Sequence, residues 1–176
     1  IGSNLVDELI KQEVEVIVLD NLSSGKKENI NPRAVFYECD VSKMSMDTFT
    51  YLFKDVDTVF HLAATPQVQY SIENPTDNNN LHSLINMLEV SRLIGAKRFV
   101  FSSSSAVYGN VYGNRMPKEG AYKSVISVFK EQYNKQPLNI VNDGEQKRDF
   151  IHVNDIIQAN ILAANLIKNH KGDIFN

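Results

Sequence analysis

Residues 14–20 read V-E-V-I-V-L-D, and this stretch decides the fold. It is short and rich in β-branched residues, which predicts a buried strand from Val14 to Leu19 that ends at Asp20. Upstream of it, Ile1, Leu5 and Leu9 recur at helical spacing and predict a helix that leads into the strand. A helix followed by a short buried strand is typical of a parallel βα unit.

The same alternation continues along the chain. Apolar periodicity predicts further strands at 34–39, 57–63, 97–102 and 148–153, and turn-forming residues predict a loop at 21–32. Helices are predicted at 46–53, 80–93, 121–133 and 155–167. In the helix at 80–93, we expect Leu81, Leu84 and Leu88 to face the core. Strands that alternate with helices favour an α/β fold with a parallel sheet and helices on both faces.

The composition is that of a globular protein and excludes several classes of function. The 176 residues carry 18 Lys and Arg against 21 Asp and Glu, a formal charge of −3, which indicates no basic face for nucleic acid. No apolar run approaches the roughly 20 residues of a membrane-spanning helix, and no signal-peptide pattern is present. The single cysteine, Cys39, is expected to be a small core residue and fits a reducing, cytoplasmic location. Since the chain opens within a pattern and without Met, we expect it to be a fragment.

Polar or small residues follow four of the predicted strands: Asp20, Asp40, the run H-L-A-A at 61–64 and the run S-S-S-S at 102–105. Because ligands bind beyond the carboxyl ends of parallel strands, this shared edge is the predicted site. In a dinucleotide-binding fold, an acidic residue about 20 positions after the glycine loop accepts hydrogen bonds from the adenosine ribose and repels a 2′-phosphate. Asp20 would then favour NAD over NADP, although taken alone it is also consistent with a turn-forming residue. Gly2 is a candidate for the last glycine of a phosphate-binding loop whose first strand and earlier glycines are missing.

The histidines indicate no metal site. His61 is expected to support the end of its strand rather than to act in catalysis. His82, His152 and His170 have no metal-ligand spacing with Cys, Asp or Glu, so we predict no metal.

Four ordered motifs resemble one family closely. They are I-G-S-N-L at 1–5, L-D-N-L-S-S-G at 19–25, F-H-L-A-A at 60–64 and S-S-S-S-A-V-Y-G at 102–109. Together they resemble the extended short-chain dehydrogenase/reductases, and within these the NAD-dependent nucleotide-sugar epimerases of the UDP-glucose 4-epimerase type. The later runs N-V-Y-G at 110–113 and D-G-E-Q-K-R-D-F at 143–150 resemble the substrate-binding half of the same family.

The resemblance covers nearly the whole chain and implies a fold. That fold is a Rossmann-type doubly wound parallel sheet, here incomplete, with part of a smaller substrate-binding portion. Residues 1–109 would be the NAD-binding Rossmann domain without its first strand and glycine loop. Residues 110–176 would combine the substrate-binding portion with late Rossmann elements.

The resemblance also implies NAD as cofactor, a nucleotide sugar as substrate and epimerisation at C4 through transient oxidation to a 4-keto intermediate. Ser104 would be the catalytic serine that hydrogen-bonds the sugar 4-hydroxyl. Asn110 and Arg148 would contact the phosphates of the nucleotide, since a planar guanidinium matches phosphate oxygens; a surface ion pair between Arg148 and Asp149 is the alternative. The implied cofactor-binding residues are Gly2, Asp20, Asn21, Ser24, Gly25, Asp40, Val41, Leu62, Ala63, Ala64 and Ser102. The intact family member is expected to be a homodimer, with no nucleic-acid or membrane partner.

Two departures from the family pattern matter for function. Ser105 and Ala106 stand where the related dehydratases and decarboxylases carry acidic residues, which favours epimerisation over those reactions. The family's base is a Tyr with a Lys four residues later, and none of the seven tyrosines here has a Lys at that spacing.

That motif would lie where Gly109 runs directly into Asn110, so a segment of several dozen residues is absent at this junction. Either these residues are a subset of a longer protein, or the polypeptide is internally deleted. In the second case, loss of the base slows the reaction by about 10²–10⁴, and we expect no turnover. The chain would then be a catalytically silent dinucleotide-binding module, and its broken sheet would expose strand edges to pairing.

Overall fold

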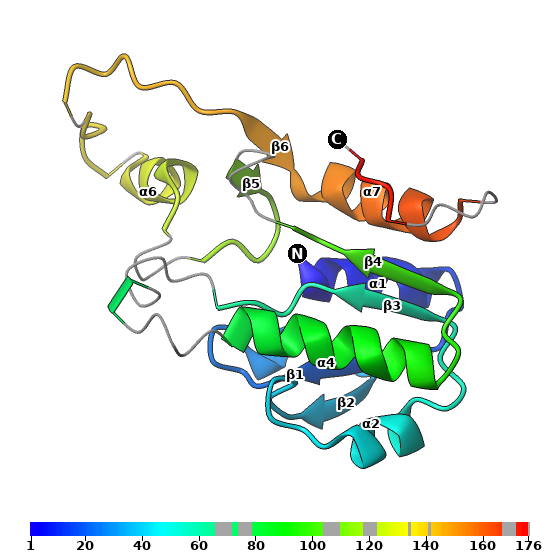
Figure 1. Cartoon of the computed structure of the whole chain (residues 1–176). Helices are drawn as coiled ribbons and strands as arrows, with labels where there is room; N and C mark the ends of the chain where they lie inside the picture. Colours follow the sequence, from blue (N-terminus) through cyan, green and yellow to red (C-terminus); the bar gives the residue numbers. More distant parts are fainter. Residues whose placement is uncertain are drawn as a thin grey trace.

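The computed structural model describes residues 1–65, 72–73, 79–103, 110–117, 123–133, 135–140, 142–166 and 172–175. Its helices are α1 (Gly2–Lys11), α2 (Met46–Leu52), α4 (Asn79–Leu93), α6 (Val125–Gln132) and α7 (Val153–Ala164), with a 3₁₀ turn, η1, at Lys27–Asn29 (Figure 1). Its strands are β1 (Ile17–Asp20), β2 (Val35–Glu38), β3 (Thr58–His61), β4 (Arg98–Phe101), β5 (Asn110–Tyr112) and β6 (Phe150–His152). The predicted α/β order is confirmed. No helix in the described part of the chain is long and apolar enough to cross a membrane.

The strands form three parallel pairs, β1–β2, β3–β4 and β5–β6. The registers begin at Ile17 opposite Val35, Thr58 opposite Arg98, and Asn110 opposite Phe150. Parallel pairing brings the carboxyl ends of paired strands to one edge, and in Figure 1 the arrowheads of β2, β3 and β4 point the same way. The edge predicted to hold the site therefore exists.

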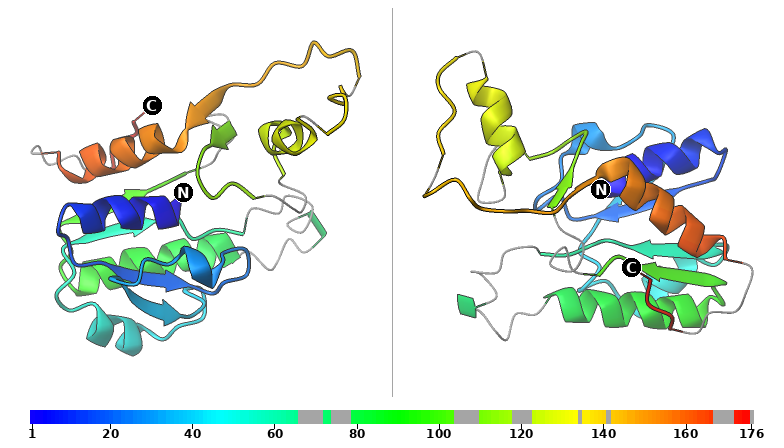
Figure 2. Two further views of the ribbon diagram at one scale, coloured as in Figure 1. Left: turned by 180° about the vertical axis from the view of Figure 1, so that it is seen from behind. Right: turned by 90° about the horizontal axis from the view of Figure 1, so that it is seen from above.

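Helices cover both faces of the strands. In Figure 1, α4 lies in front of β1 and β3, and the view from behind in Figure 2 shows α1 on the other side. Two clusters of buried apolar side chains separate these layers. The first lies between α2, α4 and β3 and consists of Val41, Phe49, Phe53, Val59, Met87 and Val90. The second lies between α1 and α7 and consists of Leu5, Val153 and Ile157, with Phe60 of β3 packed against it. Successive residues of β3 thus face opposite layers.

Local hydrogen bonds set several boundaries that periodicity placed elsewhere. The strand predicted from Val14 begins only at Ile17, because the Val14 amide still donates to the Leu9 carbonyl, at 3.1 Å, and completes the turn after α1. The helix predicted from residue 121 begins at Val125, where the Ser124 hydroxyl accepts from the Ser127 amide at 3.2 Å.

The last predicted strand and helix also shift. The strand predicted for 148–153 is the shorter β6, because His152 Nδ1 accepts from the Asn154 amide at 3.2 Å and starts α7 at Val153. In each of these cases a cap or turn, rather than the apolar pattern, decides where the element begins or ends.

The predicted core face of α4 is wrong for Leu81 and Leu88, whereas Leu84 is half-buried. Leu81 and Leu88 are exposed, by 51% and 47%, whereas the buried residues of the helix are Ser83, Met87, Val90 and Ser91. The helix carries apolar residues on two sides, so their spacing does not distinguish the face that packs on the first cluster from the face that does not.

Candidate functional site

The turn after β1 is built around the carboxylate of Asp20. Asp20 Oδ1 accepts from the Leu22 amide at 2.7 Å, and Asn21 Oδ1 accepts from the Ser23 amide at 3.0 Å. A Cβ on Gly25 would lie 3.2 Å from Asp20 Oδ2 and 3.3 Å from Oδ1. Glycine at position 25 therefore lets the loop backbone come directly against the carboxylate. Within the described residues, no hydrogen bond reaches Oδ2, so this oxygen is available to a ligand.

A second loop, after β2, is held by hydrogen bonds from two directions. Asp40 Oδ1 accepts from the Ser42 amide at 3.0 Å and from the Ser42 hydroxyl at 2.6 Å. Asn86 of α4 donates from Nδ2 to the carbonyls of Val41 and Ser42, at 3.0 and 3.1 Å. The Ser42 hydroxyl bond, with a smaller contribution from Lys43 at 3.3 Å, lowers the pKa of Asp40, so this carboxylate stays charged at neutral pH.

The segment after β3 is pinned by α4 as well. Asn80 accepts from the Thr65 amide at 2.6 Å and donates to the Thr65 carbonyl at 3.1 Å. This bidentate contact fixes residues 62–65, L-A-A-T, between β3 and α4. Ala63 and Ala64 are exposed, and their small side chains leave the backbone open to a ligand.

His61 supports the end of β3, as expected. It is 4% exposed, and its ring stacks on Phe101 with a centroid distance of 5.7 Å. Burial lowers the pKa of His61, so the imidazole is neutral at pH 7.

One groove of about 1780 Å³ joins these three strand ends. Ten of the predicted cofactor-binding residues line it: Gly2, Asp20, Asn21, Ser24, Gly25, Asp40, Val41, Leu62, Ala63 and Ala64. Cys39 lines it too and packs against the first apolar cluster; burial, and then the nearby carboxylates of Asp40 and Asp20, raise the pKa of its thiol. The groove also runs along β1 and β3 to their amino ends, so its volume is larger than that of the strand-end site alone.

The remaining predicted residues are placed differently. Ser102 is half-buried and donates to Asn160 Oδ1 of α7 at 2.9 Å. The Asn110 amide donates to the Asp149 carbonyl at 2.7 Å. Arg148 donates to the carbonyl of the preceding residue, Lys147, at 2.9 Å. None of the three lines the groove, and no ion pair joins Arg148 to Asp149 in the described part of the chain. The serine predicted to be catalytic, Ser104, and its neighbours Ser105 and Ala106 lie outside the described residues.

Sequence reasoning missed the asparagines that hold this edge together. Asn80 and Asn86 of α4 and Asn160 of α7 each bond a loop or strand end that lies far away in sequence. The N-N-N run at 78–80 is a visible signal for Asn80, whereas nothing in the sequence singles out Asn86 or Asn160. No group of three or more His, Cys, Asp and Glu side chains suited to a metal ion occurs among the described residues.

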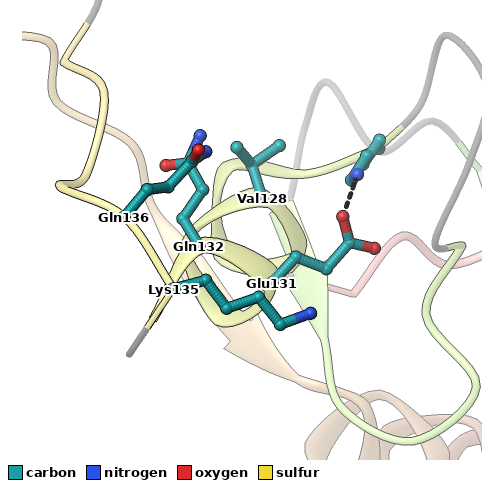
Figure 3. Close-up of a pocket in the computed structure, with 6 residues that line it drawn as sticks. Val128, Glu131, Gln132, Lys135 and Gln136 are labelled. Carbon is teal, nitrogen blue, oxygen red and sulfur yellow. Dashed lines mark hydrogen bonds and ion pairs between the residues drawn. The ribbon is translucent and has the colours of Figure 1, made fainter.

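A separate cavity of about 440 Å³ lies along α6 (Figure 3). Its lining residues are Lys123, Val128, Glu131, Gln132, Lys135 and Gln136, and an ion pair joins Lys123 to Glu131. It shares no residue with the groove at the strand ends. We therefore place the candidate site in the groove.

Comparison with known proteins agrees with this geometry. The model of the NAD dependent epimerase/dehydratase family matches residues 1–111 and 108–176. The chain belongs to this family. A Methanocaldococcus jannaschii protein assigned as a UDP-glucose 4-epimerase is 35% identical over 217 aligned positions, which cover 94% of this chain and 70% of that protein.

Two solved structures extend the likeness to three dimensions. The UDP-glucose 4-epimerase of Thermotoga maritima, solved with UDP-glucose, superposes with a TM-score of 0.81 at 30% identity, over 93% of this chain and 70% of that one. The UDP-N-acetylglucosamine 4-epimerase of Methanobrevibacter ruminantium, solved with UDP-N-acetylmuramic acid, gives 0.83 at 30% identity, over 96% and 70%. The fold is thus the Rossmann type of the epimerase family, with an incomplete sheet.

The comparisons also show that part of the relative has no counterpart in this chain. Of the 217 positions aligned with the M. jannaschii protein, only about 165 hold a residue of this chain, which is 94% of 176. About 50 positions of the relative therefore have no counterpart here. The two family matches meet at residues 108–111, where Gly109 runs into Asn110.

The described residues fit the adenosine end of NAD, the cofactor of this family. A carboxylate acceptor with one oxygen available stands at the end of β1, and the space beside it is one that a Cβ on Gly25 would fill. Hydroxyl groups of a ribose suit this acceptor, while a 2′-phosphate would meet its negative charge. NAD, when bound, accepts and returns hydride; the residues of this chain supply binding and orientation.

Proposed function

We propose that the groove binds NAD with its adenosine ribose on Asp20, and that the protein to which these residues belong interconverts nucleotide sugars by epimerisation at C4. The observation that carries the proposal is the close approach of the Gly25 backbone to the Asp20 carboxylate after β1. Both residues line the groove that the three strand ends share. The 4-epimerase relatives support the reaction type.

Each loop of the groove has a role in this proposal. Asp20 accepts from the ribose hydroxyls through Oδ2, while its Oδ1 stays with the Leu22 amide; Asn21, Ser24 and Gly25 complete this pocket. Asp40 and Val41 contact the adenine edge, in a loop that Asn86 holds in place. Asn86 is thus a positioning residue.

The rest of the groove would hold the phosphates and nicotinamide half. Gly2, at the start of α1, leaves room for the pyrophosphate near the amide groups of the first helical turn. Leu62, Ala63 and Ala64 pass under the cofactor, where small side chains permit close approach. Ser102 supports this end from the end of β4.

The sugar end of the site is the less complete part. Ser104 would form a hydrogen bond with the sugar 4-hydroxyl, and Asn110 and Arg148 would contact the phosphates of the nucleotide. Residues 1–109 would be the cofactor-binding portion, and residues 110–176 would combine the substrate-binding portion with late Rossmann elements. Since the sequence holds no Tyr with a Lys four residues later, a second candidate function is favoured for this chain by itself: NAD binding without turnover. Loss of a positioned base costs about 10²–10⁴ in rate.

Two measurements on the purified chain test both statements. A fluorescence titration with NADH is expected to show saturable binding. NAD is expected to displace the bound NADH, and NADP is not. Incubation with UDP-glucose, with UDP-galactose or with the N-acetylated form of either sugar is expected to give no conversion of one epimer into the other.

Absence of NADH binding would overturn the cofactor site. Interconversion of the two epimers would overturn the hypothesis that this chain binds NAD without turnover, and it would support epimerase activity directly. A product of lower mass would replace epimerisation by dehydration or decarboxylation, because epimerisation leaves mass unchanged.

A further inference from the structure

One carboxylate of α1 joins two segments that lie far apart in the sequence. Asp7 Oδ2 lies 2.7 Å from Nη2 of Arg115, in the segment that follows β5. Asp7 Oδ1 accepts from Asn31 Nδ2, in the loop between β1 and β2, at 2.8 Å. The helix thus holds the loop after β1 and the segment after β5 on the same side chain.

The ion pair of Asp7 and Arg115 differs from the other ion pairs between described residues. Its two side chains are 28% and 30% exposed, whereas each of the other pairs has at least one partner that is 48% exposed or more. Exposed ion pairs contribute little, because water and salt screen them. Since this pair is largely shielded from solvent, its removal is expected to have a measurable effect.

The turn that brings Arg115 to α1 has an unusual backbone. Gly113 has a φ of +138° and Arg115 a φ of +62°, a left-handed conformation that residues other than glycine rarely adopt. A Cβ on Gly113 would lie 2.6 Å from Val153 Cγ1, so the turn packs directly on the start of α7. The Asn114 carbonyl accepts from Asn4 Nδ2 of α1 at 3.3 Å. Strained backbone persists where surrounding contacts hold it, and α1 and α7 supply those contacts here.

Both segments held by Asp7 form walls of the groove. Residues 115–117 line it from the segment after β5, and residues 29–31 line it from the loop after β1. Asp7 itself does not line the groove. Its carboxylate therefore acts on a bound ligand only through the two segments.

We propose that Asp7 is a positioning residue that sets the two halves of the site against one another. The loop after β1 carries Asp20, on which we place the adenosine ribose, and the segment after β5 continues from Asn110, which we place on the nucleotide phosphates. This inference rests on the proposed function and adds to it a residue that contacts neither ligand. A ligand that orders one segment also fixes the carboxylate that holds the other, so NAD and the nucleotide sugar should each raise the affinity for the other.

Two substitutions separate the two contacts of Asp7, and a third is a matched control. Asp7→Asn keeps an oxygen for the Asn31 amide but replaces the charged Oδ2 by an NH₂ group, which cannot pair with Arg115. Asn31→Ala removes the loop contact and leaves the ion pair. Glu8→Gln removes the ion pair of Glu8 with Lys11, which lies on the same helix but is exposed and does not line the groove.

The measurement is a binding cycle on the purified chain. The Kd of UDP-glucose is measured by calorimetry without NAD and with saturating NAD, and the Kd of NADH is measured by fluorescence. In the unchanged chain and in Glu8→Gln, saturating NAD is expected to lower the Kd of UDP-glucose about fivefold or more.

The two variants of the linked residues are expected to lose this coupling in different ways. In Asp7→Asn, NAD should change the Kd of UDP-glucose by less than about twofold, while the Kd of NADH stays within about a factor of two of the control. In Asn31→Ala, the coupling should be lost as well, and NADH should bind about fivefold more weakly because the adenosine loop is no longer held.

A double variant distinguishes positioning through Arg115 from a general effect on stability. Asp7→Asn, Arg115→Gln and the two combined should weaken UDP-glucose binding in the presence of NAD by the same factor, since each removes the same ion pair. A purely structural role would instead lower Tm and weaken both ligands together, and the losses of the two single variants would add.

Several outcomes would overturn the inference alone. They are NADH binding by the unchanged chain without coupling to UDP-glucose, absence of UDP-glucose binding in the presence of NAD, coupling that survives in Asp7→Asn, and additive losses in the double variant. Absence of NADH binding by the unchanged chain would overturn the proposed function, and this inference with it.

Discussion

Asp20→Asn is the substitution that tests the cofactor site most directly. The amide can keep its oxygen toward the Leu22 amide, as Oδ1 does now at 2.7 Å, but it replaces the charged Oδ2 by an NH₂ group. A hydrogen bond to a charged group contributes about 1.5–3 kcal/mol. With about 1.4 kcal/mol per factor of ten, the Kd for NAD should rise roughly 10- to 150-fold. NADP should bind more tightly than to the unchanged chain, because the repulsion of its 2′-phosphate is lost.

The assay is NADH fluorescence with competition by NAD and NADP, and the chain offers a matched control. Asp143 makes the same kind of turn, with Oδ1 accepting from the Glu145 amide at 3.1 Å, but it is exposed and does not line the groove. Asp143→Asn should leave both Kd values unchanged. An Asp20→Asn chain whose NAD affinity stays within a factor of two of this control would refute the reasoning that Asp20 holds the ribose.

Three further outcomes are expected. Gly25→Ala places a methyl group 3.2 Å from Asp20 Oδ2 and should weaken NADH binding about tenfold with little change in Tm, since the loop is exposed; unchanged binding would separate the loop from the site. Phe49→Ala, at a side chain with 0% exposure, should cost about 3–5 kcal/mol in urea unfolding, against almost nothing for Tyr51→Ala at 78% exposure. Burial lowers the pKa of His61 below its usual 6.5, so on acidification the unfolded chain takes up this proton at a higher pH than the folded chain does. Tm should therefore stay constant above pH 6.5 and fall as the pH drops below that value. In the His61→Phe variant, this fall in Tm should be smaller.

The periodicity of the sequence predicts the order of elements because strands and helices here are short and differ clearly in apolar spacing. The strands at 57–63 and 97–102 appear as β3 and β4 within two residues at either end. Boundaries failed where a side chain competes with the ladder: His152 stops β6 by capping α7. Such caps depend on the geometry of single groups, which spacing does not encode.

The residues at the end of β1 could be singled out in the sequence for a related reason. Asp20 and Gly25 lie five residues apart, so their contact is local and its residue types are visible in the motif. The contacts of Asn86 and Asn160 are not local: Asn86 bonds a carbonyl 45 residues away, and Asn160 bonds a hydroxyl 58 residues away. Only the fold brings such partners together, and their residue types are too common to mark the contact.

The exposed leucines of α4 illustrate a deeper limit. Apolar spacing reports that a helix has a face to cover, but not which neighbour covers it. Here Met87 and Val90 pack inward, while Leu81 and Leu88 stand at 51% and 47% exposure on the opposite side. When a helix is apolar on two sides, its spacing alone does not say which side is buried.

The place where the two family matches meet bears on our expectation that cofactor binding and turnover separate. The two loops on which we place the adenosine half, after β1 and β2, are closed by contacts that involve residues 20–25, 40–43 and α4. All of these precede residue 94, whereas the two family matches meet only at residues 108–111. Of the residues proposed for the sugar end, Asn110 and Arg148 lie at or beyond that junction, and Ser104 lies four positions before it. The contacts of these two loops involve no residue at that junction, so we expect NAD binding to be independent of the segment that carries the base in the family.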